Sequence, residues 1–403
     1  MICRFCSQPL SYEFVNLNFS PPSNSYLSTD QLSYQESYYP LKVMVCKHCF
    51  LVQIDEYKKS SEIFNANYPY FSSMSSSWVE HARTYVEMIC QKQPFSAESL
   101  IIEIASNDGY LLQFFKAKNI PCIGIEPTKS TADTAKSKGI DVVEDFFGVT
   151  LAQTLPKADL ILGNNVLAHV PDINDFVMGL KMVLKTDGII TMEFPHLLNL
   201  IEHNQFDTIY HEHYSYLSLM TTITIFKAHG LAIYDVEELP THGGSLRIYA
   251  MHDTDHPPMT DRLENVLLKE RKTHLHTLQG YSGFQFKVDK VKNDFLAFLS
   301  ESNSKGKKII AYGAAAKGNT LLNYCEIKND RIDFVVDKAP SKIGKFLPGS
   351  HIPVVSEEKI REVKPDYIII FPWNIKEEII MQLTYVREWD AKFVVAIPSL
   401  EIL

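Results

Sequence analysis

The sequence predicts an α/β protein that contains two Rossmann-like sheets. Short apolar runs alternate with stretches of helical pattern, first over 100–193 and again over 308–371. Strands that alternate with helices at this spacing are typical of doubly wound parallel sheets. A charged stretch of helical pattern, 261–303, separates the two regions, and four of the seven cysteines lie in the first 49 residues. We therefore divide the chain into four parts: 1–60, 61–255, 256–303 and 304–403.

The composition is that of an ordinary globular protein. The 403 residues are enough for two or three domains, with 45% hydrophobic and 22% charged residues. A net charge of −9 without a long basic run argues against a nucleic-acid groove, but is compatible with a locally basic phosphate pocket. The start, MICRFC, lacks the features of a signal peptide, and no apolar run approaches the roughly 20 residues of a membrane helix. We expect a cytoplasmic protein that binds neither nucleic acid nor membranes.

The first part is predicted to be a small, loop-rich module. It is rich in Ser, Tyr and Asn and contains the pair Pro21-Pro22. A module of this size hardly buries enough core to fold unaided. After it, a Ser-rich stretch indicates a loop or a helix cap. From Ser77 onward, helical periodicity places apolar residues on one side, namely Trp78, Ala82, Tyr85 and Met88-Ile89.

The elements of the two sheets follow in chain order. The strands predicted for the first sheet are 100–104, 122–125, 141–143, 159–163 and 188–193, and the helices between them are 110–119, 128–138 and 174–184. The stretch 214–250 adds a helix and two strands, one of them 246–250. The second sheet starts with strand 308–312, the loop GAAAKGN and a helix, and continues with strands 334–336 and 367–371. The charged stretch between the sheets is predicted to be a long helical connector.

Two C-x2-C knuckles indicate a metal site. Cys3, Cys6, Cys46 and Cys49 supply four thiolates, which suit tetrahedral zinc. The 39 residues between the knuckles exceed the usual spacing of a short ribbon, so the module must loop out. A closed four-cysteine site leaves no open position for a substrate, so this zinc is expected to be structural. Unmetallated thiols and a redox or iron–sulfur site are the alternatives, and His48 is predicted to be a bystander.

A cofactor site is predicted at the start of the first sheet. The stretch 101-IIEIASNDGYLL-112 is a strand, a turn of small residues and a helix start, which lets a ligand approach the backbone. It lacks the G-x-G-x-x-G of dinucleotide sites, and the second strand ends at Glu126, where an acid binds ribose hydroxyls. These features fit S-adenosylmethionine (SAM) better than NAD. The alternative is an ordinary Rossmann-like turn with surface acids.

The predicted cofactor-binding residues lie at the ends of four strands or in the loops that follow them. They are Glu103, Ala105, Asn107, Asp108, Glu126, Asp145, Phe146, Asn164 and Asn165. Asp145 and Phe146 either contact adenine or belong to a plain loop. Asn164 and Asn165 follow the fourth strand and would face the cofactor at the carboxyl edge of the sheet.

Together, these and other motifs resemble the sugar-nucleotide C-methyltransferase family, whose best-described members methylate C3 of TDP-linked 4-keto-deoxysugars. The resemblance covers nearly the whole chain, and the order and number of the motifs make it specific. Its motifs are the two knuckles, SPPSNSYL (20–27), YPYFSS (68–73), EIASNDGYLL (103–112), GIEP (124–127), NNVLAHV (164–170), YHEHYSYLS (210–218), HGGSLRIY (242–249), GAAAKGNTLLNY (313–324) and DKAPSKIGKFLPGSHIPV (337–354). The family is similar in its parts: a zinc module, a Rossmann-like SAM methyltransferase domain and a second Rossmann-like domain.

The stretch 207-DTIYHEHYSYLS-218 supplies proton-handling side chains for this chemistry. A carbon beside a ketone becomes nucleophilic as an enolate, which requires a base and a stabiliser for the oxyanion. By the resemblance, His213 is the base at C3, Glu212 positions the substrate or biases the imidazole, and Tyr210 donates to the keto or enolate oxygen. The resemblance also assigns His169 and Tyr70 to the C4 oxygen or to the substituents of the reacting carbon. The alternative for His213 and His169 is a structural role.

Other residues are expected to bind substrate or to pack. His211 is expected to point elsewhere, and Tyr214 and Tyr216 to be packing residues. The substrate-binding candidates are Asn24, Arg247 and Lys317. The loop that carries Lys317 is similar to a phosphate-binding turn, but a solvated lysine is the alternative. Arg247 either contacts diphosphate or forms a structural salt bridge. The second sheet lacks a dinucleotide motif, so it either closes over the substrate nucleotide or completes the fold.

We expect a SAM-dependent C-methyltransferase that acts on C3 of an NDP-4-keto-6-deoxyhexose, as a monomer or homodimer. Its product would be a branched-chain deoxysugar for a lipopolysaccharide or a secondary metabolite. Methylation of oxygen or nitrogen on a sugar nucleotide is a second hypothesis, in which deuterium at C3 would survive. A SAM- or sugar-nucleotide-binding protein without turnover is a third, and the intact YHEH cluster argues against it.

Overall fold

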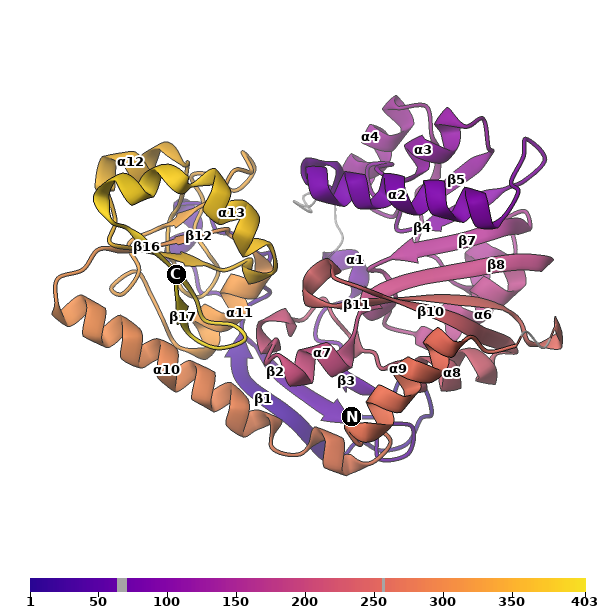
Figure 1. Ribbon diagram of the computed structural model, residues 1–403, viewed down its shortest axis with the longest axis horizontal. Helices are drawn as coiled ribbons and strands as arrows, with labels where there is room; N and C mark the ends of the chain where they lie inside the picture. The colour runs from indigo at the N-terminus through magenta and orange to yellow at the C-terminus, as the bar shows by residue number, and fades with distance from the viewer. Residues whose placement is uncertain (64–70, 256–257) are drawn as a thin grey trace.

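The computed structural model describes residues 1–63, 71–255 and 258–403 (Figure 1). Its central sheet has seven strands, in the order β10 (Leu231–Leu239), β11 (Ser245–His252), β8 (Leu184–Pro195), β7 (Ala158–Asn164), β4 (Ile101–Ile104), β5 (Cys122–Ile125) and β6 (Asp141–Val143). The five strands from β8 to β6 pair in parallel, whereas β10 and β11 are antiparallel. The predicted doubly wound sheet is therefore confirmed.

Helices cover both faces of this sheet (Figure 1). On one face lie α2 (Ser76–Lys92), α3 (Leu112–Ala117) and α4 (Lys129–Ser137), and on the other lie α6 (Ile173–Val183), α8 (Leu219–Ala228) and α9 (Asp261–Lys272). Both faces of the sheet are apolar, because successive side chains of a strand point to opposite faces. Ile101 belongs to the core under α2, and Ile102 belongs to the core under α6. The Asp172 carboxylate caps α6 by accepting from the N–H groups of Asn174 and Asp175.

The C-terminal sheet has six strands, in the order β14 (Val354–Val355), β13 (Val335–Val336), β12 (Ile309–Tyr312), β15 (Tyr367–Ile370), β16 (Lys392–Val395) and β17 (Glu401–Ile402). All neighbours pair in parallel except β16 and β17. The helices of this domain are α11 (Ala316–Tyr324), α12 (Glu358–Val363) and α13 (Lys376–Gln382). The second Rossmann-like unit expected from the sequence is thus present.

The N-terminal module contains more strand than the predicted loop-rich module. Strands β1 (Tyr12–Ser20), β2 (Tyr39–Val45) and β3 (Val52–Ile54) form an antiparallel sheet, and β9 (Ser215–Tyr216) from the central domain pairs with β3. The module does not bury its core alone, because Phe14 on β1 stacks on Phe284 with ring centroids 4.6 Å apart. Residues of β1 and of the C-terminal domain belong to one continuous hydrophobic core.

The expected helical connector is broken. Helix α9 packs against the central sheet, and α10 (Phe284–Ser304) lies against β1 and leads to the C-terminal domain (Figure 1). Between them, His274 and Gly283 have left-handed backbone conformations, with φ of 61° and 76°. A Cβ on Gly280 would lie 2.7 Å from the carbonyl carbon of His274, so the turn is too tight for a larger residue.

The remaining elements are short. They are the helices α1 (Ser60–Ile63), α5 (Val149–Ala152) and α7 (Leu197–Glu202) and the 3₁₀ turns Asp30–Ser33, Ser72–Met74, Leu167–His169, Phe206–Thr208, Thr241–Gly243, Asp253–Asp255, Leu278–Tyr281, Trp373–Ile375 and Thr384–Trp389. In the described part of the chain, no helix combines the length and the apolar character needed to cross a membrane.

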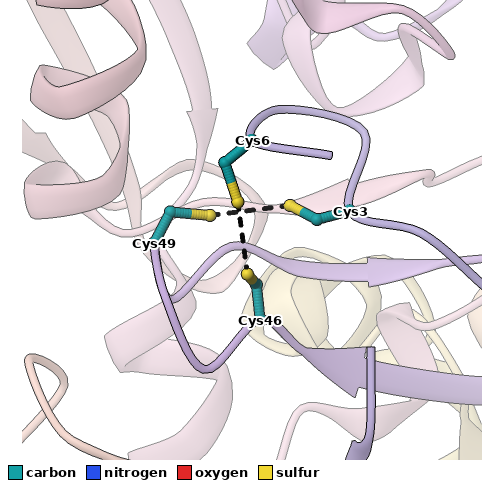
Figure 2. Close-up of side chains that lie close together, drawn as sticks. All are labelled: Cys3, Cys6, Cys46 and Cys49. Atoms are coloured by element: carbon teal, nitrogen blue, oxygen red, sulfur yellow. Dashed lines mark hydrogen bonds between the residues drawn. The ribbon is translucent and has the colours of Figure 1, made fainter. Parts of the chain in front are cut away.

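The four N-terminal cysteines converge on one point (Figure 2). Their sulfur atoms all lie within 4.8 Å of one another, and the Cys3–Cys49 and Cys6–Cys46 pairs are 3.5 Å apart. Zinc–sulfur bonds of about 2.3 Å in a tetrahedron require sulfurs about 3.8 Å apart, so the cluster fits zinc. His48 is exposed and outside the cluster, as expected.

The two knuckles have the same backbone geometry. In each, the residue four positions after the first cysteine is left-handed and donates its N–H to the carbonyl of that cysteine. These bonds are Ser7 to Cys3 and Phe50 to Cys46, both 2.9 Å long. Gln53, on β3, donates from Nε2 to the Cys3 sulfur at 3.3 Å. The metal site therefore fixes the end of β2, the start of β3 and the N-terminus relative to one another.

We predict that Cys49→Ser lowers the free energy of unfolding by on the order of 4 kcal/mol or more, because three thiolates no longer close the site. Metal analysis and thermal denaturation of the variant check this. Cys90→Ser, which removes a thiol outside the cluster, is the matched control. A Cys49→Ser protein with one tightly held zinc and unchanged stability would contradict the prediction.

Candidate active site

The loop after β4 has an unusual backbone. Ala105, Asn107 and Gly109 are all left-handed, with φ of 58°, 49° and 74°. Left-handed residues other than glycine are strained, and such strain is concentrated at ligand sites. A Cβ on Gly109 would lie 2.4 Å from the Ile140 side chain, so only glycine fits there. The predicted small-residue turn thus presents its backbone to the edge of the sheet.

Glu126 and this loop hold each other in place. The Asn107 N–H donates to Glu126 Oε2 at 3.0 Å, and the Thr128 N–H donates to Oε1 at 2.8 Å. Glu126 is buried, and burial raises the pKa of its carboxyl. Two residues predicted to bind one cofactor, Asn107 and Glu126, are therefore in direct contact.

Glu103 is a buried acid without a hydrogen-bond partner among the described residues. Its exposed fraction is 0%, and neither carboxylate oxygen is paired. Burial, together with the nearby Asp108 and Glu126, raises the pKa of Glu103 well above its usual value. An orphaned buried carboxylate is costly, so it is expected to face a ligand that carries hydroxyl or ammonium groups. SAM, with its ammonium and ribose hydroxyls, fits this requirement.

Residues 72 and 73 cover the same loop. The Ser72 N–H donates to Asn107 Oδ1 at 2.8 Å, and the Ser73 hydroxyl donates to Asp108 Oδ2. Lys138 lies 3.7 Å from the same oxygen of Asp108, while Asp108 Oδ1 has no described partner. Asp108 is therefore held in place through Oδ2, while its Oδ1 remains available to a ligand.

The other predicted cofactor residues divide into two groups. Asn164 and Asn165 lie at the carboxyl edge of the sheet as expected, and Asn164 Nδ2 is 3.3 Å from the Tyr110 hydroxyl. Asp145 and Phe146 are exposed after β6, and Phe146 is 42% exposed. The Asp145 carboxylate accepts from the N–H of Phe146 at 2.7 Å. Both hypotheses for this pair, adenine contact and plain loop, stay open.

His213 is held in one tautomer. Its Nδ1 lies 2.9 Å from the Thr208 carbonyl oxygen. Because a carbonyl only accepts, Nδ1 carries the hydrogen and Nε2 carries the lone pair. Burial, helped by His169, His242 and Lys317, holds the pKa of His213 well below 6.5. The imidazole is therefore neutral at neutral pH, which is the form that accepts a proton.

The other predicted catalytic residues surround this imidazole. The ring centroids of Tyr210 and His169 lie 4.1 Å and 4.6 Å from that of His213. Burial lowers the pKa of His169 to about 4. Glu212 is buried, and Asn24 of the N-terminal module donates from Nδ2 to its Oε1 at 2.7 Å. The structure thus brings four of the five candidates together, while Tyr70 lies outside the described residues.

Neighbours of His213 point toward the N-terminal module. His211 Nε2 lies 3.3 Å from the Pro40 carbonyl oxygen, and the His211 ring packs against Tyr39 and Tyr57. The Tyr214 hydroxyl donates to the Lys58 carbonyl at 3.0 Å. Tyr216 is buried on β9, where it pairs with β3. These contacts agree with the packing roles expected for His211, Tyr214 and Tyr216.

Arg247 is part of an ion-pair network. Its guanidinium donates to Glu193 Oε2 at 2.7 Å and to Glu237 Oε2 at 3.2 Å, and lies over the Tyr85 ring. Burial alone would raise the pKa of Glu193, but His81 and Arg247 lower it to about 2. Of the two alternatives for Arg247, the structure shows the salt bridge, because its charge is already neutralised inside the protein.

Lys317 reaches the site from the C-terminal domain. Its Nζ donates to Asn374 Oδ1 at 2.7 Å and lies 4.3 Å from the centre of the Trp373 ring. Burial lowers the pKa of Lys317 to about 8, and Asp207 opposes this change. The lysine is therefore half-buried near the imidazole cluster, where Asn374 and Trp373 hold its ammonium group.

Two residues beside this cluster, His242 and Trp373, were not predicted from the sequence. His242 Nε2 lies 2.8 Å from Asn165 Nδ2, and Trp373 donates from Nε1 to Asp207 Oδ2 at 2.7 Å. His242 immediately precedes two glycines in the HGGSLRIY motif, which was an available signal. Trp373 lies in a stretch without a motif, so only the fold brings it to the site.

We predict that Glu103→Gln changes the pH dependence of stability. The pKa of Glu103 is raised on folding, so its contribution to stability falls as pH rises above about 4.3, the value in an unfolded chain. At pH 7 the variant should be more stable than the parent by about 1 kcal/mol or more, and should bind SAM about tenfold more weakly. Melting between pH 5 and 8 and calorimetric titration with SAM check this. The exposed Glu98→Gln is the control, and parallel melting curves for Glu103→Gln and the parent would contradict the prediction.

Family models match three parts of the chain. A zinc binding domain matches residues 3–64, a methyltransferase domain matches 80–236, and a C-methyltransferase C-terminal domain matches 240–398. The predicted zinc module and SAM-dependent methyltransferase domain are thereby confirmed.

One relative covers the full length. The chain is 30% identical over 405 aligned positions to the C-methyltransferase NovU of Streptomyces niveus, with 100% of this chain and 96% of the relative aligned. Among solved structures, a SAM-dependent methyltransferase of Clostridium acetobutylicum is 11% identical, covering 43% of this chain and 92% of its own, with a TM-score of 0.36. The magnesium protoporphyrin IX methyltransferase of Synechocystis is 14% identical, covering 44% and 81%, with a TM-score of 0.34.

The match to NovU extends from the cysteine knuckles to the C-terminal sheet, and the three domain models match in the same order. The chain therefore belongs to the C-methyltransferase family, with a zinc binding domain, a SAM-dependent methyltransferase domain and the family's C-terminal domain.

Proposed function

We propose that this C-methyltransferase methylates C3 of an NDP-4-keto-6-deoxyhexose through an enolate. The observation that carries the proposal is the fixed tautomer of His213, whose Nε2 lone pair belongs to a half-buried ring with a lowered pKa. Methyl transfer to oxygen or nitrogen does not require a base for a carbon-bound proton, whereas transfer to carbon does. The resemblance of the YHEH motif to that of sugar-nucleotide C-methyltransferases supports the choice of substrate.

His213 has the properties that proton abstraction from C3 requires. Nε2 accepts the C3 proton, and the Thr208 carbonyl then stabilises the imidazolium through Nδ1–H. The electron pair left on C3 is shared with the C4 oxygen, which the Tyr210 hydroxyl would stabilise by donating a hydrogen bond. Bound SAM supplies an electrophilic methyl group. Glu103, Asn107 and Glu126 would bind it at the carboxyl ends of β4 and β5.

Two further groups are proposed to bind the sugar nucleotide. Asn24 of the N-terminal module donates to Glu212 at 2.7 Å, and the two side chains are suited to bind hydroxyl groups of the sugar. The ammonium of Lys317 is suited to the diphosphate, because it is a cation close enough to His213 and His242 to lower their pKa values. Arg247 is not part of this proposal, since Glu193 and Glu237 already pair with it.

We predict that wild-type protein in D2O exchanges the C3 hydrogen of the substrate and adds one methyl group, whereas His213→Gln does both roughly 10²- to 10⁴-fold more slowly. Mass spectrometry of TDP- and GDP-4-keto-6-deoxyhexoses with SAM measures both rates. His211→Asn is the matched control, because His211 lies two residues away but is directed to Pro40, and its rates should stay within a few-fold of wild type. A methylated product that keeps its original hydrogen at C3 in D2O would instead indicate O- or N-methylation.

We predict that kcat/KM falls on the acid side only at pH values below about 6.5, and that KM for the sugar nucleotide rises above about pH 8. Because burial keeps the pKa of His213 well below 6.5, the base stays unprotonated and kcat/KM should be level from pH 7.5 down to about 6.5. Lys317, with a pKa of about 8, loses its charge above pH 8, so KM for the sugar nucleotide should rise about tenfold per pH unit there. Lys317→Met should have a high KM that no longer changes between pH 7 and 9. An alkaline limb that persists unchanged in this variant would exclude Lys317.

A further inference from the structure

Trp373 of the C-terminal domain touches the segment that holds His213. Its indole Nε1 donates to Asp207 Oδ2 at 2.7 Å. Asp207 directly precedes Thr208, whose carbonyl accepts from His213 Nδ1. The segment 205–213, called the His213 loop below, therefore contains both the base and the carboxylate that receives the indole N–H.

The same indole fills the space beside a second loop. A Cβ on Gly243 would lie 2.4 Å from Cη2 of Trp373, so the ring occupies the place of a side chain there. Gly243 belongs to the segment 241–244, called the His242 loop below. Three consecutive residues of this loop, His242 to Gly244, are left-handed, with φ of 55°, 90° and 116°. The Gln205 side chain joins the two loops by donating to the Gly243 carbonyl at 2.7 Å.

Helix α11 of the C-terminal domain completes this contact. The Thr320 hydroxyl donates to the Ile209 carbonyl at 2.8 Å, inside the His213 loop. Lys317 lies over the indole face and next to the buried Asp207. Burial raises the pKa of Asp207 to about 6, and Lys317 and the indole N–H oppose this by stabilising the carboxylate. The indole is thus fixed on one face by Lys317, at its N–H by Asp207 and at its edge by Gly243.

We propose that Trp373 is a positioning residue, whose indole clamps the His213 loop and the His242 loop together so that His213 keeps its hydrogen bond to Thr208. Trp373 itself need not touch the reacting atoms. The catalytic consequence rests on the proposed role of His213, but the clamp itself does not. In this proposal the C-terminal domain contributes to catalysis by restraining the loops of another domain.

Trp373→Phe tests the clamp, because it keeps most of the ring and removes the N–H donor. Trp389→Phe is the matched control: Trp389 lies in the same domain and donates from Nε1 to the Pro365 carbonyl at 3.1 Å, away from the site. Hydrogen–deuterium exchange followed by mass spectrometry reads the two loops directly. The protected amides of interest are those of Thr208, Ile209, His213 and Gly244.

Loss of one hydrogen bond to a charged group should make these amides exchange on the order of tenfold faster in Trp373→Phe, and not in Trp389→Phe. For the enzyme reaction, we expect kcat to fall about tenfold or more with an unchanged Kd for SAM. Unchanged exchange in both loops would overturn the clamp. Faster exchange with an unchanged kcat would overturn its role in positioning. If the wild type methylates none of the keto-sugars, the proposed function fails, and the exchange data still decide whether the clamp exists.

Discussion

His213 presents a lone pair at Nε2 only while Nδ1 remains bonded to the Thr208 carbonyl, and much of the fold contributes to keeping that bond. The zinc site fixes β3, which pairs with β9 two residues after His213. Asn24 reaches Glu212 from the N-terminal module, and α11 binds the Ile209 carbonyl from the C-terminal domain. The segment around the imidazole is thus restrained from three directions, and each restraint comes from a different part of the sequence.

The charges around the site are separated in a way that suits two ligands of opposite charge. The cofactor side holds three buried acids, Glu103, Asp108 and Glu126, and SAM carries a sulfonium and an ammonium. The other side holds neutral histidines and the cation Lys317, which suits the anionic sugar nucleotide we propose. Because the three acids are buried and the histidines and Lys317 are half-buried, their fields are screened less by salt than the fields of surface charges would be. Each ligand therefore meets a field that favours its own side.

The parts of the structure that depend on local pattern could be predicted from the sequence. Apolar runs that alternate with helical stretches indicated both Rossmann-like sheets, and the spacing of Cys3, Cys6, Cys46 and Cys49 indicated zinc. The strands of the N-terminal module were missed, since their apolar faces are completed by α10, more than 200 residues away.

Contacts between distant segments explain the other differences. Nothing local to Arg247 says that Glu193 and Glu237 will neutralise it, and nothing local to Trp373 says that Asp207 will receive its N–H. For the same reason, the motif around His213 could be found from the sequence, whereas the residues that hold it in place could not.

The shared core of β1 and α10 also constrains the order in which the chain can fold. A ribosome releases Phe14 long before Phe284, yet the two rings stack on each other in the finished protein. Until α10 has been synthesised, the apolar face of β1 has no partner, and closing so long a loop is slow. Early binding of the metal by the two knuckles would restrain the unpartnered N-terminal segment. It would join Cys3 to Cys49 before either the central or the C-terminal domain has been synthesised. Zinc supply during translation would then influence how much of the protein escapes aggregation.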